Sequence, residues 1–304
     1  MEYVLQTRAL CKRYRDFTAL RGLDMHVPKG AIYGVVGRNG AGKTTLIRLI
    51  CGLQEPTAGS FTLYGVQNTD ARIARSRRRL GAVVETPSLC LDMTARENIC
   101  LQYRVLGIPS DDGADELLRL VGLGDTGRKK AKNFSLGMRQ RLGIAVALAG
   151  HPDLLVLDEP VNGLDPEGII EVRELVLRLN RENGITVIIS SHILDELARL
   201  ATHYGFLDDG RMVKEMTAAE LEQVSRKCMR LTVSDTARLA PVLDRLGADY
   251  RITSGTEANV YSEISVAALV HALEDGGCAL HSVREQDESL ESFYMNLVGG
   301  GRHA

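Results

Sequence analysis

The stretch GVVGRNGAGKTTLIRLI, residues 34–50, constrains the fold more than any other part of the chain. A short apolar run leads into three glycines, Gly37, Gly40 and Gly42, and a lysine, two threonines and several good helix formers follow. Glycine lets backbone N–H groups converge at close range, and a helix that begins here directs the positive end of its dipole to the same point. The stretch therefore predicts a strand, a phosphate-binding loop and a helix.

The loop fits the phosphate-binding pattern G-x-x-x-x-G-K-S/T. The predicted nucleotide-binding residues of this loop are Gly37, Arg38, Asn39, Gly40, Ala41, Gly42, Lys43, Thr44 and Thr45. Lys43 can neutralise β- and γ-phosphate charge, and the Thr44 hydroxyl can ligate Mg²⁺. The alternative is a glycine-rich turn that binds nothing, but the complete pattern between a strand and a helix favours phosphate binding.

A nucleotide site also needs a carboxylate for its metal ion, and LLVLDEP (154–160) supplies two acids. Asp158 ends an apolar run that reads as a buried strand, where an ionised group requires a partner. Mg²⁺ is the natural partner, and Glu159 could polarise the attacking water as a general base. Alone, the two acids would be an ordinary strand end; beside a phosphate loop they predict a catalytic site.

Apolar strands alternate with amphipathic helices along most of the chain, which predicts a mostly parallel α/β sheet. We expect a P-loop NTPase of the α/β class with a RecA-like core, an antiparallel β subdomain near the N-terminus and an inserted helical subdomain at about 86–145. This nucleotide-binding part is predicted to occupy residues 1–222. Residues 223–304 read as strands and helices in β-α-β-β-α-β order, typical of a small α+β domain of ferredoxin-like type.

The composition favours a protein of the cytosol without a large nucleic-acid surface. The 304 residues carry a net charge of −2, and the two basic runs, RIARSRRRLG and RKKAK, are best interpreted as solvated helix faces, with a nucleic-acid or membrane patch as the alternative. The longest apolar runs fall short of the ~20 residues that span a bilayer. The six scattered cysteines show no metal-binding spacing and are interpreted as reduced, mostly buried residues.

A second helix start lies in FSLGMRQRLGIA (134–145), where Ser135 and Gly137 precede the helix. Backbone N–H groups and a helix dipole could receive an anion here. Judged from these residues alone, an N-cap role for Ser135 is the better interpretation.

The order of these motifs resembles that of the ABC ATPases over about residues 1–220. Lys43, FSLGMRQ and Asp158 occur in the family's order and spacing, NGLDP (162–166) matches the D-loop, and SSH (190–192) matches the switch histidine. The family signature LSGGQ reads Phe134-Ser135-Leu136-Gly137-Met138 here, so the first glycine and the glutamine are absent. This variant resembles the bacitracin- and lantibiotic-type export ATPases.

The resemblance implies further roles for individual residues. His192 would bind the γ-phosphate, and Ser135 and Gly137 would face the ATP held by a second subunit. Tyr14 would stack on adenine, and the alternative from its sequence context is a half-buried strand tyrosine. Glu85 stands where the family has the glutamine of its glutamine loop. A carboxylate there can ligate Mg²⁺ more strongly but also repels the γ-phosphate.

The resemblance also implies a complete transport system. The chain would be the ATP-binding and ATP-hydrolysing subunit of an ABC-2-type exporter, with ATP and Mg²⁺ as ligands. It would lie in the cytoplasm, peripheral to the inner face of the membrane. A separate permease would carry an antibiotic peptide, a drug or a lipid-like cargo, and a second cassette, identical or a paralogue, would complete the pair. The alternative is a soluble ABC ATPase that acts on ribosomes or nucleic acid.

Overall fold

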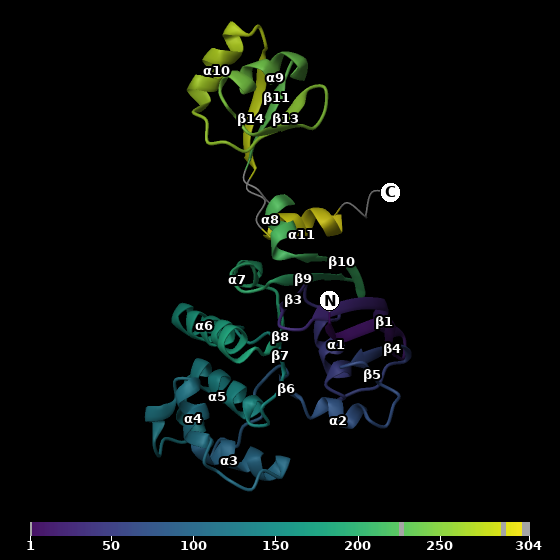
Figure 1. The fold of residues 1–304 in the computed structure, drawn as a ribbon, viewed down its shortest axis with the longest axis vertical. Helices are drawn as coiled ribbons and strands as arrows, with labels where there is room; N and C mark the ends of the chain where they lie inside the picture. The colour runs from purple at the N-terminus through teal and green to yellow at the C-terminus, as the bar shows by residue number, and fades with distance from the viewer. Residues whose placement is uncertain (1, 225–227, 287–289, 300–304) are drawn as a thin grey trace. The chain divides into compact units, whose positions relative to one another are not determined.

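The computed structural model describes residues 2–224, 228–286 and 290–299 (Figure 1). The chain forms two compact units, Met1–Ala218 and Ala219–Ala304, called here the N-terminal unit and the C-terminal unit. The sequence predicts a division after residue 222, which lies within helix α8 (Ala218–Val224).

A six-stranded sheet forms the centre of the N-terminal unit, in the order β10-β9-β3-β8-β7-β6. Its strands are β3 (Ile32–Gly37), β6 (Leu80–Val83), β7 (Leu154–Asp158), β8 (Thr186–Ser191), β9 (His203–Asp208) and β10 (Arg211–Thr217). The first five pair in parallel, and β10 pairs antiparallel to β9. Every residue of β3, β7 and β8 is buried, as expected for parallel strands that are covered on both faces. The predicted α/β class is confirmed.

An antiparallel sheet in the order β2-β1-β4-β5 makes the second layer. Its strands are β1 (Tyr3–Tyr14), β2 (Phe17–Pro28), β4 (Ala58–Leu63) and β5 (Val66–Gln67). Helix α1 (Lys43–Ile50) lies between the two sheets (Figure 1) and buries Leu46, Ile47, Leu49 and Ile50 in the core that they share. Because α1 begins directly after the glycine-rich loop, this apolar packing fixes the direction in which the loop faces.

The other helices of this unit cover the opposite face of the central sheet or lie beside it (Figure 1). They are α2 (Ile73–Arg77), α3 (Ala95–Leu106), α4 (Ala114–Leu120), α5 (Leu136–Leu148), α6 (Pro166–Asn183) and α7 (Leu194–Ala198), with 3₁₀ turns at Gly124–Thr126 and Ala131–Asn133. Helix α3 begins with a capping box, in which Thr94 and Glu97 exchange side-chain and backbone hydrogen bonds. These helices include the helical region predicted at about 86–145.

Strands β9 and β10 form a hairpin with Asp209 and Gly210 at its turn. Asp209 has φ 43° and Gly210 has φ 73°. Two successive positive φ values are typical of the tight turns that Asp-Gly favours.

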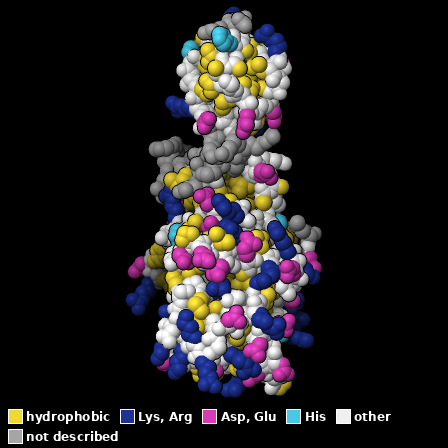
Figure 2. Space-filling view, turned by 90° about the vertical axis from the view of Figure 1, so that its left-hand side faces the viewer, with side chains coloured by type: hydrophobic (Ala, Val, Ile, Leu, Met, Phe, Trp, Pro, Cys, Tyr) yellow, Lys and Arg dark blue, Asp and Glu magenta, His cyan; other side chains and the backbone are white. Residues whose placement is uncertain are grey.

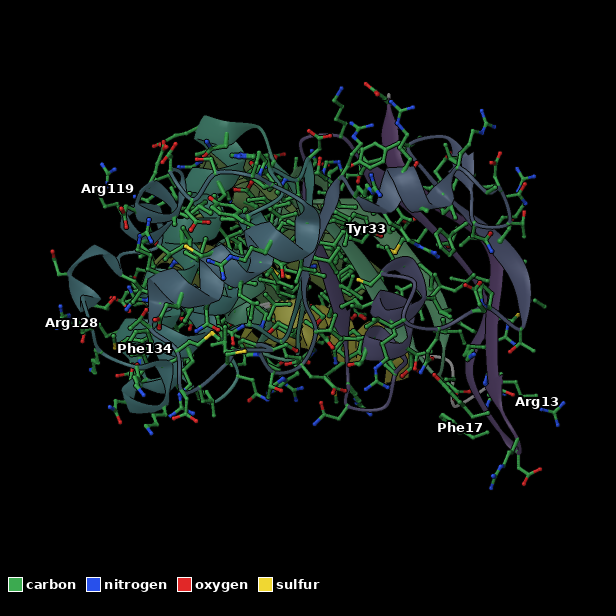
Figure 3. The ribbon with its side chains drawn as sticks, turned by 90° about the horizontal axis from the view of Figure 1, so that it is seen from below. Arg13, Phe17, Tyr33, Arg119, Arg128 and Phe134 are labelled. Carbon is green, nitrogen blue, oxygen red and sulfur yellow. The ribbon has the colours of Figure 1, made fainter. Side chains whose placement is uncertain are left out.

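The first basic run is largely the solvated face that its sequence predicted, since four of its five arginines, Arg72, Arg75, Arg78 and Arg79, are exposed. Two arginines of the run also contact aromatic rings. The Arg79 guanidinium lies 3.7 Å from the centre of the Tyr64 ring, and the Arg77 guanidinium lies 5.9 Å from that of Phe61. Planar guanidinium groups stack on aromatic faces, so part of this run packs against the β4 region. In the second run, Arg128 points outward (Figure 3). On the face shown in Figure 2, Lys and Arg side chains are interspersed with Asp and Glu over the helices.

The C-terminal unit contains a four-stranded antiparallel sheet in the order β12-β13-β11-β14. Its elements are β11 (Cys228–Val233), α9 (Thr236–Arg245), β12 (Tyr250–Ile252), β13 (Glu257–Val260), α10 (Val266–Asp275), β14 (Leu280–Gln286) and α11 (Leu290–Gly299). The β-α-β-β-α-β order is the one the sequence predicted. Helices α9 and α10 pack against one face of this sheet through a core of its own, which includes Leu231, Leu243, Val260 and Leu269.

Within the described ranges, no helix is both long enough and apolar enough to cross a bilayer.

Candidate functional site

A cavity of about 460 Å³ opens at the carboxyl ends of β3, β7 and β8. It is lined by Phe17, Ala19, Arg38, Asn39, Gly40, Gly42, Lys43, Thr44, Thr45, Glu159, Asn162 and His192. In open α/β sheets, ligands bind outside the carboxyl ends of the strands. The structure therefore brings the predicted phosphate loop, Glu159 and His192 to one cavity.

Lys43 is held inside the loop that it would use to bind phosphate. Its side chain is only 6% exposed. The Nζ donates to the carbonyl of Gly37 at 2.7 Å and to that of Arg38 at 3.3 Å, and lies 3.2 Å from Glu159 Oε1. A buried ammonium needs such partners, and all of them are acceptors that an anionic ligand could replace.

Gly42 precedes α1 in a conformation that other residues rarely adopt. It has φ 108°, and a Cβ atom built there would lie 2.7 Å from the Ala19 carbonyl oxygen and 2.8 Å from Leu20 Cδ2. No side chain caps the start of α1. The first N–H groups of this helix are therefore directed at the cavity with no side-chain acceptor, which suits an anion.

Asp158 presents one free carboxylate oxygen. Its side chain is 1% exposed, and its Oδ1 accepts a hydrogen bond from Ser190 Oγ at 2.6 Å. Its Oδ2 is buried and has no hydrogen-bond partner among the described residues. A buried carboxylate oxygen without a partner fits the first ligand of a divalent cation. Burial, followed by the negative charge of Asp158, raises the pKa of the nearby Cys51 to about 12, so this thiol is neutral.

Glu159 connects the loop to the end of β8. Its Oε1 forms an ion pair with Lys43, and its Oε2 is in hydrogen-bond contact with Nδ1 of His192. Its backbone N–H donates to Ser190 Oγ at 2.9 Å, and its φ is 50°, an unusual value for a residue with a side chain. Strained backbone of this kind is common at functional sites, because surrounding contacts hold it in place.

Phe17, which the sequence analysis did not single out, is the aromatic residue that lines the cavity. Its side chain is 58% exposed, and it lies at the outer end of the β1–β2 pair (Figure 3). Tyr14 pairs with Phe17 across the two strands but does not line the cavity. Its hydroxyl donates to Gln54, and Lys12 Nζ lies 5.2 Å from the centre of its ring. The adenine role of Tyr14 stays a prediction. No local sequence signal marks Phe17, because its place at the cavity depends on the pairing of β1 with β2.

Glu85 lies after β6 and outside the residues that line the cavity. Its Oε1 accepts from Arg48 Nη2 at 2.6 Å, and its φ is 59°. Arg48 belongs to the last turn of α1, so the position predicted to sense the nucleotide is tied to the helix that begins at the phosphate loop. The role of Glu85 in metal binding stays a prediction.

Ser135 is the N-cap of α5, and its Oγ accepts from the N–H of Met138 at 3.2 Å. The N-cap interpretation is confirmed. Neither Ser135 nor Gly137 lines the cavity of its own chain. Their proposed contact with ATP would require a second subunit and stays a prediction. Asn162, from the stretch that matches the D-loop, does line the cavity, and its N–H donates to the Glu159 carbonyl at 3.1 Å.

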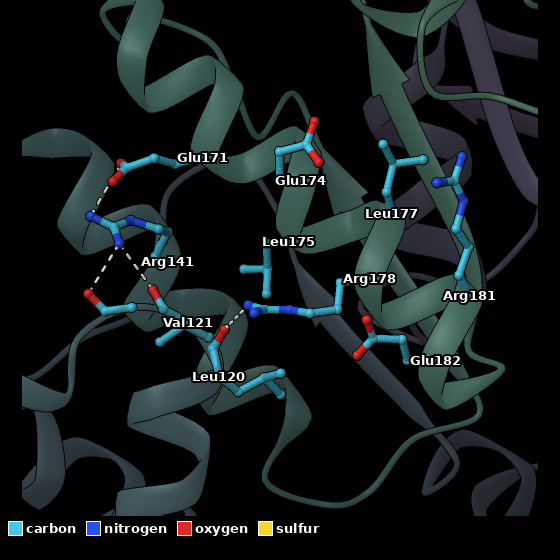
Figure 4. A pocket seen from close by; sticks show the side chains of 11 residues that line it. Leu120, Val121, Arg141, Glu171, Glu174, Leu175, Leu177, Arg178, Arg181 and Glu182 are labelled. Carbon is cyan, nitrogen blue, oxygen red and sulfur yellow. Dashed lines mark hydrogen bonds and ion pairs between the residues drawn. The ribbon is translucent and has the colours of Figure 1, made fainter.

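A second cavity, where α4, α5 and α6 meet, shows how the helix that follows Ser135 is anchored (Figure 4). Arg141 of α5 donates to the carbonyls of Val121 at 3.0 Å and Gly122 at 3.2 Å, and it pairs with Glu171 of α6 at 3.2 Å. Arg178 of α6 donates to the Leu120 carbonyl. Cations stabilise the carbonyls at a helix C-terminus, so these two arginines hold the end of α4 against both neighbours.

Comparisons with known proteins bear on the same site. The family model described as ABC transporter matches residues 20–162. The bacitracin transport ATP-binding protein BcrA of Enterococcus faecalis is 38% identical over 303 residues, covering 99% of this chain and 98% of that protein. The lantibiotic transport ATP-binding protein SrtF of Streptococcus pyogenes is 41% identical over 212 residues, covering 70% of this chain and 90% of that protein.

Solved structures resemble the N-terminal part of the chain. An ATP-binding cassette of an ABC transporter in its ADP conformation has a TM-score of 0.67 and 26% identity, covering 74% of this chain and 95% of that chain. A nucleotide-free ATP-binding cassette has a TM-score of 0.66 and 26% identity, covering 73% and 94% of the two chains.

Replacement of Gly42 by alanine should weaken nucleotide binding and lower the thermal midpoint, because the new Cβ would overlap the Ala19 carbonyl and distort the loop. A left-handed φ also costs a non-glycine residue about 1–2 kcal/mol. Gly22→Ala is the matched control, since Gly22 also has positive φ but open space around its Cβ position. Differential scanning fluorimetry and titration with a fluorescent ATP analogue measure both effects. Equal loss of ATP affinity in the two variants would contradict the steric argument.

Proposed function

This chain belongs to the ABC transporter family, and from that premise we propose that it uses ATP to drive an exporter of peptide antibiotics. It is an ATP-binding subunit whose ATP hydrolysis is coupled to transport across a membrane. The observation that supports the proposal most strongly is the meeting of Lys43, Glu159 and His192 at one cavity at the carboxyl edge of the sheet. Two relatives that extend over nearly the whole chain are named for bacitracin transport.

Several residues of this chain would contribute to ATP hydrolysis, each in a different role. The loop from Gly37 to Thr45 and Lys43 would bind the phosphates, and His192 would contact the γ-phosphate. Glu159 would act as the general base that orients and polarises the attacking water. The triphosphate would replace Glu159 as the negative partner of Lys43, and this exchange would release the carboxylate for catalysis. Phe17 or Tyr14 would contact the adenine.

Mg²⁺ fits the residues beside this cavity. Asp158 Oδ2, buried and without a partner, and the Thr44 hydroxyl would hold the ion, with Glu85 as a further candidate ligand. Bound Mg²⁺ would neutralise phosphate charge as it develops during phosphoryl transfer. Ser190 would keep Asp158 in the orientation that leaves Oδ2 free, through the bond to Oδ1.

The partners follow from the same family. We propose a membrane permease of the ABC-2 type, carried on a separate chain, and a second cassette whose Ser135 and Gly137 face the ATP bound by this chain. Such a complex would place the chain at the inner face of the cell membrane. The exposure of Leu136, 48%, is consistent with a partner surface at the start of α5. Bacitracin-like peptides are the first cargo to test, followed by other drugs and lipid-like molecules.

The alternative of a soluble ATPase acting on ribosomes or nucleic acid gains no support from the relatives reported above. They are described as transport proteins. The contacts of Arg77 and Arg79 with aromatic rings also hold part of the longer basic run against the β4 region.

Glu159→Gln should leave ATP binding intact and lower turnover by about 100-fold or more, because an amide cannot accept the proton from water. Lys43→Ala is the companion variant and should weaken binding itself. Equilibrium binding and phosphate release measure the two properties separately. Turnover of the Glu159→Gln protein at the wild-type rate would refute the assignment of the base.

Ser190→Ala should raise the Mg²⁺ concentration needed for half-maximal turnover, because Asp158 loses the hydroxyl that orients it. Ser191→Ala is the control, since the Ser191 hydroxyl accepts from Ile193 N–H at 2.9 Å. Phosphate release measured across a Mg²⁺ series gives the result. An unchanged Mg²⁺ dependence in the Ser190 variant would exclude this role.

An affinity-tagged chain, isolated from detergent-solubilised cells of its own organism, should retain a membrane protein with several predicted spanning helices. Mass spectrometry identifies the retained partner, and the Lys43→Ala chain controls for binding that depends on nucleotide. Sedimentation of the tagged chain with ribosomes, in place of a membrane protein, would favour the alternative function.

A further inference from the structure

The sheet of the C-terminal unit has one covered face and one polar face. Helices α9 and α10 lie on the covered face (Figure 1), where Leu231, Val233, Ala258 and Val260 join the core. Successive side chains of a strand point to opposite faces. The residues between these apolar positions therefore lie on the face away from the helices.

One row of that polar face crosses all four strands. Arg251 of β12 is paired with Asn259 of β13, Asn259 with Arg230 of β11, and Arg230 with Arg284 of β14. We call these four residues the arginine row. Neighbouring strands lie about 4.8 Å apart, so the row brings three guanidinium groups to a line only three strand spacings long.

The charge in this row is only partly paired among the residues that the structure describes. Arg230 and Arg284 lie directly opposite each other on neighbouring strands, and like charges in that position destabilise a sheet. One carboxylate, that of Glu257, pairs with Arg230 at 2.9 Å. Arg251 and Arg284 are exposed, and within the described ranges neither forms a hydrogen bond or an ion pair. The sheet thus bears a repulsion that an anionic partner would relieve.

The surroundings of the row limit the kind of anion. The next row along the strands contains Thr232 and Ser282, whose hydroxyl groups lie 3.0 Å apart. At this point of the sheet the positive charge is therefore confined to a single row of residues. The central strands present Arg230, Thr232 and Asn259 to this face. Basic surfaces that bind anionic lipid usually gather four to eight Lys or Arg residues, more than this row supplies.

We propose that the arginine row binds an acidic segment of a partner polypeptide, with Arg251 and Arg284 as its main contacts. The planar guanidinium group of arginine receives a carboxylate through two parallel hydrogen bonds, and a line of three such groups matches successive carboxylates of an extended chain. This inference does not depend on the nucleotide site or on the cargo.

The test uses the full chain and a fluorescein-labelled hexaglutamate peptide at low salt, with hexaglutamine as the uncharged probe. The double variant Arg251→Ala/Arg284→Ala should bind hexaglutamate about 10-fold more weakly than wild type, as expected for two exposed ion pairs. The double variant Arg238→Ala/Arg245→Ala removes the same charge from α9, on the opposite face, and should bind like wild type. Equal affinity in the wild-type and Arg251/Arg284 proteins would overturn the proposal.

A second variant separates binding from folding. Arg284→Thr removes the like-charge pair and places a hydroxyl in the row, so the thermal midpoint should stay the same or rise while hexaglutamate affinity falls. ATP turnover should be unchanged in every variant, which keeps this test distinct from that of the ATPase. Vesicles containing phosphatidylserine and a single-stranded oligonucleotide are the competing probes. Arginine-row variants that lose either of these but keep hexaglutamate binding would contradict an acidic peptide as the partner.

Discussion

The parallel hydrogen bonding of β3, β8 and β7 is the constraint on which the nucleotide site depends. Val36 is level with Ser191, and Ser190 is level with Asp158. The residues that follow these strands therefore leave the sheet at one edge, from three segments far apart in the chain. A shift of one residue in any of these pairings would turn Asp158 or Ser190 to the opposite face. The complete burial of the three strands stabilises the register.

Ion pairs and hydrogen bonds then fix the side chains that the sheet brings to this edge. Lys43 is buried, so its ammonium requires acceptors, and it takes the carbonyls of its own loop together with Glu159. The same carboxylate pairs with His192. A base, a cation and a histidine are thereby held in one connected group. Ser190 donates a hydrogen bond to one carboxylate oxygen of Asp158, and the other oxygen stays available for a cation.

Much of the site could be predicted from the sequence because its residues are contiguous. The phosphate loop and the pair Asp158-Glu159 are short motifs whose chemistry depends on neighbouring positions. Phe17 could not be found in this way, since it enters the cavity through the pairing of β1 with β2. The pairing of Glu85 with Arg48 was equally inaccessible, because it joins residues 37 positions apart. The ring contacts of Arg77 and Arg79 were inaccessible for the same reason, because they depend on the packing of separate segments.

The sequence by itself determined the family, the α/β class, the phosphate loop and the order of strands and helices in the C-terminal unit, because these depend on local pattern and composition. Tertiary structure alone decided which partner each charged side chain takes. An isolated arginine or glutamate is equally compatible with water, a ring, a carbonyl or an opposite charge, and only strand register and helix packing select among them. The arginine row is the clearest case: Arg230, Arg251 and Arg284 are scattered along the sequence, and sheet pairing places them in one line.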